Sequence, residues 1–140
     1  MDYKLELVLI PVSDVDRAMK FYLEQAGFVL IVDTPIGPEQ RVVQVVPPGS
    51  ECAIGFGTGI TSAAPGSAQG LHLVVSDIIA ARAELAERGV PIGPVRHMAD
   101  GQWVDGPHPG RENYQSFADF ADPDGNTWVL QEVHQPEPAA

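Results

Sequence analysis

Apolar residues at every second position divide much of the chain into short strand-like runs. Residues 4–11 show this pattern clearly, because Leu5, Leu7 and Leu9 alternate along them, and residues 70–75 form a similar run. Gly and Pro residues punctuate the remaining β-type segments. These further predicted strands cover residues 28–33, 40–46, 52–57, 91–96, 114–121 and 126–133.

A change in the spacing of apolar residues from two to three or four predicts two helices. The first apolar stripe begins at Val15 and ends before Gly27, and the second begins at Ile78 and ends before Gly89. Each helix therefore stands between a preceding strand and a group of short strands.

The two helix starts belong to an internal repeat. Val-Ser-Asp-Val at residues 12–15 recurs as Val-Ser-Asp-Ile at residues 75–78, an offset of 75 − 12 = 63. Ser13 and Asp16 predict a capping box for the first helix, and Asp77 predicts an N-cap for the second.

The repeat predicts an α+β fold of two tandem βαβββ modules in one domain that spans residues 1–140. Neither module can bury its sheet face alone, so the two should pack as a pair, within one chain or across a dimer. We place the parts at about residues 4–57 (first module), 58–69 (linker), 70–133 (second module) and 134–140 (tail).

Residues 97–113 form the longest predicted loop. A loop of this length inside a small domain is more often functional than idle. Its Trp103 could close over a flat ligand or anchor the loop in the core, and we expect its His97 and His108 to be exposed to solvent.

Charge and composition exclude several classes of partner. The chain has 8 Lys and Arg against 19 Asp and Glu, which gives 8 − 19 = −11 and opposes binding to nucleic acid or to an anionic membrane. No apolar run approaches the roughly 20 residues of a membrane span, and the start Met-Asp-Tyr-Lys is unlike a signal peptide. We therefore expect a cytoplasmic protein.

Cys52 is the single cysteine, so no disulfide can form within the chain, and we expect this thiol to be buried and inert.

Three stretches of the chain resemble the vicinal oxygen chelate superfamily, which groups glyoxalase, bleomycin-resistance and dioxygenase-like proteins. They are LVLIPVSDVDRAMKFY, LHLVVSDIIAARAELAERGV and FADFADPDGNTWVLQEV, and the Asp-Pro-Asp-Gly-Asn turn in the last is fairly specific for the fold. The resemblance implies a curved mixed sheet around a concave cavity that binds a small molecule. It also implies a homodimer.

In metal-using members, the resemblance implies ligands on the first and last strand of each half. The corresponding positions here are occupied by Leu7, Ala53, Gly70 and Val129, and none of these side chains can bind a metal. Residues two positions along should face the same cavity, and these are Leu9, Gly55, His72 and Gln131. We therefore expect no cofactor, and a divalent metal only if the long loop or a second chain supplies a third ligand.

His72 is the best candidate for chemistry, because an imidazole can hydrogen-bond to a ligand oxygen or transfer a proton near neutral pH. Gln131 would be its partner in orienting the ligand. We predict the remaining ligand contacts to be Leu7, Leu9 and Val129 on an apolar cavity floor, Trp103 in the loop, and Gln44 and Tyr114 on inner strands whose facing the sequence leaves open. Trp128 and Glu132 should face the opposite side of the sheet.

Three functions stay open at this point. We favour a metal-free protein that binds or sequesters an apolar or aromatic small molecule, as bleomycin-resistance-like members are taken to do. The second is a metal-free acid/base enzyme (an isomerase, lyase or cyclase) that uses His72. The third is a metal-dependent lyase, epimerase or dioxygenase of the glyoxalase type, against which the missing ligands argue.

Overall fold

The computed structural model describes residues 1–134, and in this range the chain forms an α+β fold with one sheet of four strands and another of five. The two sheets belong to separate units. The first unit contains residues 1–69 and 122–126, and the second contains residues 70–121 and the chain from residue 127 onward. The domain boundaries predicted from the sequence stay predictions, and residues 135–140 of the predicted tail lie outside the described residues.

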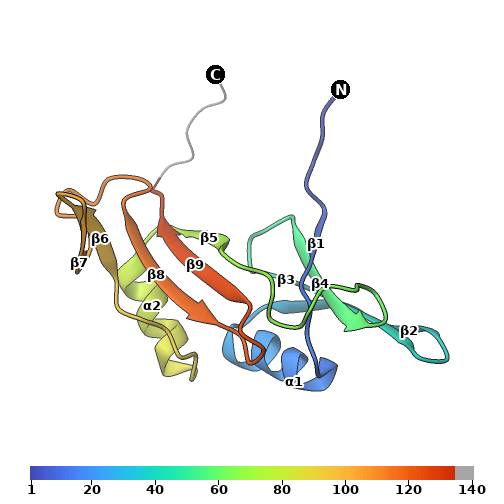
Figure 1. Ribbon diagram of the computed structural model, residues 1–140. Helices are drawn as coiled ribbons and strands as arrows, with labels where there is room; N and C mark the ends of the chain where they lie inside the picture. The colour runs from blue at the N-terminus through green and yellow to red at the C-terminus, as the bar shows by residue number, and fades with distance from the viewer. Residues whose placement is uncertain (135–140) are drawn as a thin grey trace. The chain divides into compact units, whose positions relative to one another are not determined.

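The first unit has the order strand, helix and three strands (Figure 1). Its sheet has the order β1-β4-β3-β2, in which β1 runs parallel to β4 and the other pairs are antiparallel. A π-helical turn, η1, continues α1 directly. The elements are β1 (Leu7–Leu9), α1 (Val15–Lys20), η1 (Phe21–Gln25), β2 (Val29–Gly37), β3 (Gln40–Val46) and β4 (Ala53–Thr58).

The core of the first unit lies on the helix side of its sheet. Tyr22 is fully buried there, and its ring centroid lies 5.6 Å from that of Phe28 and 5.6 Å from that of Phe56. The Tyr22 hydroxyl donates to the buried Asp122 carboxylate at 2.7 Å. Asn126 Nδ2 donates to the Pro11 carbonyl at 2.8 Å. The Asp-Pro-Asp-Gly-Asn turn of residues 122–126 is therefore fixed into this unit by buried hydrogen bonds.

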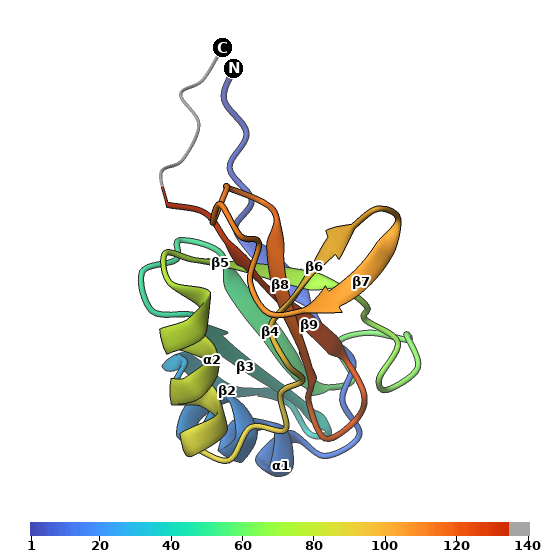
Figure 2. The same cartoon turned by 90° about the vertical axis from the view of Figure 1, so that its left-hand side faces the viewer.

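The second unit has the sheet order β5-β9-β8-β6-β7, with β5 parallel to β9 and the remaining pairs antiparallel. Helix α2 contacts β8 and β9, and the hairpin of β6 and β7 extends the sheet beyond β8 (Figure 2). The elements are β5 (Leu71–Val75), α2 (Ile78–Glu87), β6 (Arg96–Ala99), β7 (Gln102–Asp105), β8 (Ser116–Ala121) and β9 (Thr127–Glu132).

Burial alternates strictly along β8 and β9, which defines the two faces of the second sheet. The helix face carries buried side chains, among them Phe120 and Trp128, whose rings stack at 6.0 Å. The prediction that Trp128 is core is therefore confirmed, and Glu132 faces the same side, as predicted. The half-buried residues that alternate with them point to the other face of the sheet.

The predicted strand at residues 91–96 is wrong. Only an isolated bridge between Ile92 and Phe120 forms there, and the strand begins at Arg96. Pro91 and Pro94 lack the N–H groups that a strand ladder needs. The predicted loop then starts with the β6–β7 hairpin, which turns at Asp100 and Gly101, both with positive φ (51° and 78°). Asp-Gly at such a turn is a strong hairpin signal.

The predicted capping box at the first helix is also wrong. Asp14 is the N-cap, and its carboxylate accepts from the Arg17 N–H at 3.0 Å. Ser13 instead donates its hydroxyl proton to Asp124 Oδ1 at 2.6 Å. The predicted cap of the second helix is confirmed, since Asp77 accepts from the Ala80 N–H at 3.1 Å.

Candidate functional site

Four of the eight predicted site residues, His72, Trp103, Val129 and Gln131, lie on the face of the second sheet that points away from α2; we call it the open face. Strand register orders its side chains in two rows across the sheet. One row runs through Val74, Gln131, Phe117 and Arg96, and the other runs through His72, Val129 and Asp119. The structure thus brings His72, Gln131 and Val129 onto one surface.

Trp103 joins this surface from β7. Its ring meets the Phe117 ring edge to face, with centroids 5.7 Å apart and planes at 89°. The Arg96 guanidinium lies 4.3 Å from the centroid of the Trp103 ring, and it pairs with the Asp119 carboxylate at 2.6 Å. Trp103 remains 48% exposed, so these contacts leave aromatic surface for a ligand. Because Asp119 neutralises Arg96, this group carries no net charge.

His72 lies on the edge strand β5 and is exposed. Its Nδ1 atom lies 2.7 Å from the carbonyl oxygen of Gly70. Gly70 has φ +73°, a conformation that favours glycine, and its N–H donates to the Thr127 hydroxyl at 2.7 Å. The ring is therefore held by a backbone group that is itself fixed to the neighbouring strand β9.

Gln131 is half-buried in the middle of the open face. Its amide Nε2 donates to the Tyr114 carbonyl in a long hydrogen bond of 3.5 Å. Tyr114 lies just before β8 and not on an inner strand as predicted. Its φ is +68° and its N–H donates to the Glu132 carbonyl at 2.9 Å, so the backbone of Tyr114 borders β9 beside Gln131.

An ion pair on the helix face fixes the segment that leads to Tyr114. The Glu132 carboxylate is fully buried, and it accepts from Arg111 Nε at 2.8 Å and from the Ile78 N–H at 2.9 Å. These bonds, first of all the one from Arg111, lower the pKa of Glu132 from 4.5 to about 2 despite its burial. The same contact raises the pKa of Arg111. Sequence reasoning did not predict this ion pair between Arg111 and Glu132.

The first sheet also has a face that points away from its helix. Leu7, Leu9, Gly55 and Gln44 share it, because Leu9 pairs with Gly55 and Gly55 pairs with Gln44. A Cβ atom on Gly55 would lie 3.0 Å from Leu9 and 3.1 Å from Leu7, so the leucines lie across the glycine. Strand pairing therefore shows which face of the sheet Gln44 lies on, a point that the sequence left open. The predicted contacts Leu7, Leu9 and Gln44 lie on this same face.

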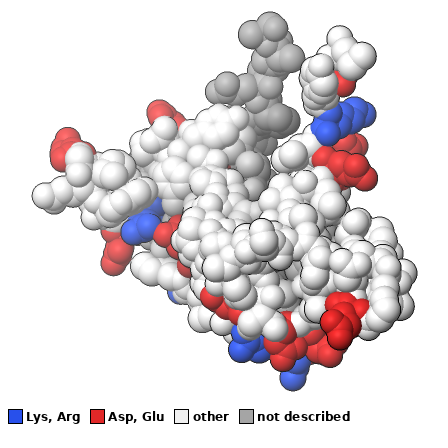
Figure 3. Space-filling view, turned by 45° about the vertical axis from the view of Figure 1, so that its right-hand side comes forward, with Lys and Arg blue, Asp and Glu red and all other residues white. Residues whose placement is uncertain are grey.

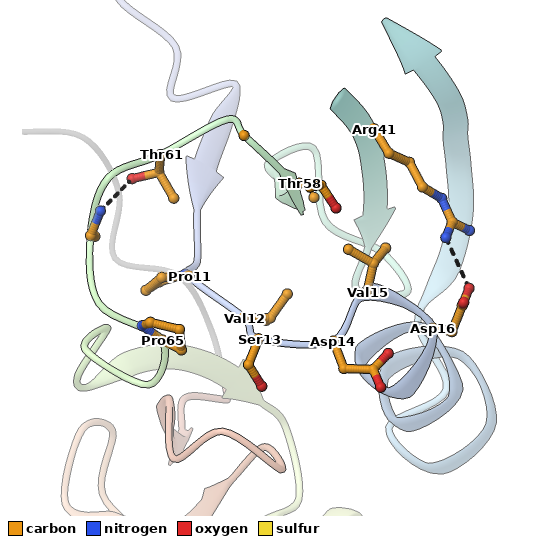
Figure 4. A pocket seen from close by; sticks show the side chains of 13 residues that line it. Pro11, Val12, Ser13, Asp14, Val15, Asp16, Arg41, Thr58, Thr61 and Pro65 are labelled. Atoms are coloured by element: carbon orange, nitrogen blue, oxygen red, sulfur yellow. Dashed lines mark hydrogen bonds and ion pairs between the residues drawn. The ribbon is translucent and has the colours of Figure 1, made fainter. Parts of the chain in front are cut away.

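A polar cavity of about 520 Å³ lies elsewhere in the first unit, between the start of α1 and the chain that follows β4 (Figure 4). Its charged groups are already paired. Arg41 donates to Asp16 at 2.9 Å and to Asp33 at 2.9 Å, and Asp14 caps α1. Arg41 lowers the pKa of Asp33, which keeps this carboxylate charged. The cavity contains no residue that the sequence predicted as a ligand contact.

The residues do not fit the metal site that the fold family implies. Leu7, Ala53, Gly70 and Val129 stand at the ligand positions and offer no side-chain donor. Within residues 1–134, no three His, Cys, Asp or Glu side chains lie close enough to hold a metal ion. The expectation that the protein uses no metal stays a prediction.

The histidines of the predicted long loop do not supply a third ligand beside His72. His97 is buried, contrary to the prediction, and its Nδ1 lies 2.8 Å from the Gly106 carbonyl. His108 is half-buried, with its ring centroid 6.1 Å from that of His97. Strand alternation places His97 on the face opposite to Arg96 and therefore opposite to the open face.

Sequence reasoning missed several residues of the open face, among them Val74, Arg96, Phe117 and Asp119. Phe117 and Asp119 alternate with Ser116, Ala118 and Phe120 along β8. Each of the two alternating sets contains a phenylalanine, so the sequence pattern does not show which set faces the core.

Cys52 is half-buried rather than fully buried as predicted, because it precedes β4 instead of lying in it.

Charged side chains form small groups of mixed sign between wide uncharged areas in the view of Figure 3. The excess of acidic residues is thus dispersed on this side of the molecule.

Among the described helices, none has the length and apolar character needed to cross a membrane. The cytoplasmic location stays a prediction.

Residues 4–130 match the model of the Glyoxalase/Bleomycin resistance protein/Dioxygenase superfamily. The crystal structure of TnmS3, an antibiotic binding protein from Streptomyces sp. CB03234, is 34% identical, with a TM-score of 0.72 over 94% of this chain and 96% of that one. A glyoxalase/bleomycin resistance protein from Streptomyces sp. CB03234 is 35% identical, with a TM-score of 0.69 over 91% and 99%. The uncharacterized protein YetH of Bacillus subtilis is 24% identical over 127 residues, which cover 89% of this chain and 94% of YetH. The chain therefore belongs to the Glyoxalase/Bleomycin resistance protein/Dioxygenase superfamily.

Proposed function

We propose that the protein binds and sequesters an apolar, aromatic small molecule on the open face, without a metal ion. The observation that carries the proposal is the aromatic pair of Trp103 and Phe117 beside a neutralised Arg96, on a surface that also holds His72 and Gln131. Exposed aromatic area with a few convergent polar groups is typical of small-molecule sites. TnmS3 is an antibiotic binding protein, and this similarity supports a small-molecule ligand.

Each proposed contact has a distinct role. Trp103 and Val129 offer apolar surface, and Gln131 offers an amide donor and acceptor to a polar group of the ligand. Leu7, Leu9 and Gln44 belong to the first sheet, and their role as ligand contacts stays a prediction. Tyr114 borders the open face through its backbone and is proposed as a contact at its rim.

A metal-free acid/base enzyme is the second candidate, and the exposed imidazole of His72 favours it. The two functions differ in what a His72→Gln variant would do. For the enzyme, the variant should bind its substrate and lose turnover. For the binding protein, neither the wild type nor the variant should convert the ligand.

Calorimetric titration of a panel of aromatic antibiotics tests the proposed function. We expect at least one member to bind, with affinity unchanged after chelator treatment and dialysis. Trp103→Ala should weaken that binding about tenfold or more, because an aromatic contact is worth on the order of 1 kcal/mol beyond the lost apolar area. Val104→Ala is the matched control, since Val104 is a neighbour in β7 with similar exposure (43% against 48%) and points to the other face.

Two results would contradict the proposal. The first is a panel in which no aromatic molecule binds. The second is binding that disappears with the chelator and returns with a stoichiometric divalent metal.

We also propose that the protein is a homodimer. Strand β2 supports this, because it is a nine-residue edge strand whose apolar side chains are exposed. Val29, Ile31 and Ile36 are each more than half exposed, at 54%, 53% and 54%. A long apolar edge of this kind offers a template for pairing with another chain.

A further inference from the structure

We infer that His72 acts as a hydrogen-bond acceptor on the open face, and that the ligand is an elongated aromatic molecule without negative charge that carries a hydroxyl or N–H donor. The inference rests on the proposed function and makes its ligand class specific. It depends on the ring geometry of His72 and on the charge balance of the surface.

The tautomer of His72 follows from its partner. Nδ1 lies 2.7 Å from the Gly70 carbonyl oxygen, and a carbonyl can only accept, so Nδ1 must carry the proton. In the neutral ring, Nε2 then has the free lone pair. Within residues 1–134, the Gly70 carbonyl is the one hydrogen-bond partner of this ring. The exposed imidazole therefore offers an acceptor to a ligand.

The backbone conformation of Gly70 supports the hydrogen bond between its carbonyl oxygen and His72 Nδ1. A Cβ atom added to Gly70 would meet nothing within 4 Å, so the glycine is not needed to leave space. Its φ of +73° is what favours glycine there, and this conformation turns the carbonyl toward the ring of His72. The bond from the Gly70 N–H to the Thr127 hydroxyl fixes the other side of the residue.

The charged groups of the open face leave no free positive charge for an anionic ligand. Arg96 pairs with Asp119 at 2.6 Å, and its guanidinium also covers the Trp103 ring. Strand register places the exposed Asp105 opposite Arg96 on the same face, so this surface carries a net negative charge. An anionic ligand would have to be desolvated there without a free counter-charge, and a ligand without negative charge avoids that cost.

Strand spacing sets the length of the ligand. His72 lies on β5 and Phe117 on β8, which are two strands apart, or roughly 10 Å at about 4.8 Å per strand. A molecule that contacts both residues therefore needs a rigid body about as long as several fused rings. A single phenol ring is too short.

Two measurements test the inference. Long-range ¹H–¹⁵N spectra of ¹⁵N-histidine-labelled protein at pH 8 should show His72 with its proton on Nδ1. Titration with 1-hydroxypyrene and 1-methoxypyrene compares two flat probes of similar size, of which only the first donates a hydrogen bond. We expect 1-hydroxypyrene to bind about fivefold more tightly and to shift the Nε2 resonance of His72, as one hydrogen bond predicts.

Variants separate the role of His72 from general effects on folding. His72→Phe keeps a flat ring and should abolish the difference between the two probes. Gly70→Ala should move the His72 proton toward Nε2. Gly49→Ala is the matched control, because Gly49 also has positive φ (+82°) and open space at Cβ, yet lies in the first unit.

A proton on Nε2 in the wild type, or equal affinity for both probes, would overturn the inference and leave the proposed function standing. If neither probe binds although an antibiotic of the panel does, the inferred shape of the ligand is wrong; if the whole panel also fails to bind, the proposed function is contradicted. The tautomer measurement is independent of that outcome, since it requires no ligand.

Discussion

The buried carboxylate of Glu132 holds the chain segment between Arg111 and Tyr114 against β9. This carboxylate is fully buried and receives hydrogen bonds from Arg111 and from the first N–H of α2. Breaking such a pair leaves an uncompensated charge in the interior, so both partners are needed together. Because Arg111 lies three residues before Tyr114, the pair also fixes the backbone that borders Gln131.

Replacement of Glu132 by Gln should lower the free energy of unfolding by about 2 kcal/mol at pH 7, since the charged hydrogen bonds from Arg111 are weakened. Urea unfolding followed by circular dichroism measures this value. Glu112→Gln is the control, because Glu112 is an exposed residue next to Arg111, and it should change stability by less than about 0.5 kcal/mol. Equal effects of the two variants would show that the pair does not stabilise the fold.

The same pair predicts a specific pH dependence. The pKa of Glu132 is about 2 in the folded protein and near 4.5 when unfolded, so the folded state favours the ionised form. This contribution is complete above pH 4.5 and is lost as the pH falls toward about 2. The difference in unfolding free energy between wild type and Glu132→Gln should therefore be constant from pH 6 to pH 8 and shrink below pH 4.5. A difference that grows on acidification would contradict the depressed pKa.

At the scale of elements, the sequence predicted much of the fold because alternation and turn residues are local signals. β3 lies at residues 40–46, as predicted, and β4, β8 and β9 differ from their predicted bounds by one or two residues. Alternation also predicted that His72 and Gln131 share a side of the sheet. The contact between Trp103 and Phe117 was beyond sequence reasoning, because it requires that β6 pair with β8 across a long stretch of chain.

Gly57 offers a direct test of the pairing of β3 with β4. A Cβ atom at Gly57 would lie 1.8 Å from the Arg41 carbonyl oxygen, a backbone atom that cannot move without breaking the ladder. Gly57→Ala should therefore destabilise the protein by more than about 2 kcal/mol in thermal or urea unfolding.

Gly55→Ala is the matched control for Gly57→Ala. The atoms nearest to its Cβ belong to the flexible side chains of Leu7 and Leu9, which can give way. If the two alanine variants unfolded at the same urea concentration, the register described here would be wrong.

At the scale of the whole molecule, the exposed apolar edge of β2 predicts self-association. Ile31→Lys places a charge on this edge and should shift the protein from dimer to monomer in sedimentation velocity at micromolar concentration. Ile79→Lys is the control, because Ile79 is similarly exposed (45%) but lies on α2. A wild type that sediments as a monomer would contradict the proposed dimer.

Ligand binding on the open face of the second sheet can be tested by mapping ¹H–¹⁵N and methyl chemical-shift changes on addition of the tightest-binding aromatic antibiotic. We expect the largest changes at Val74, Val129 and the indole N–H of Trp103. Changes confined to α2 or to the polar cavity around Asp14 and Thr58 would contradict it.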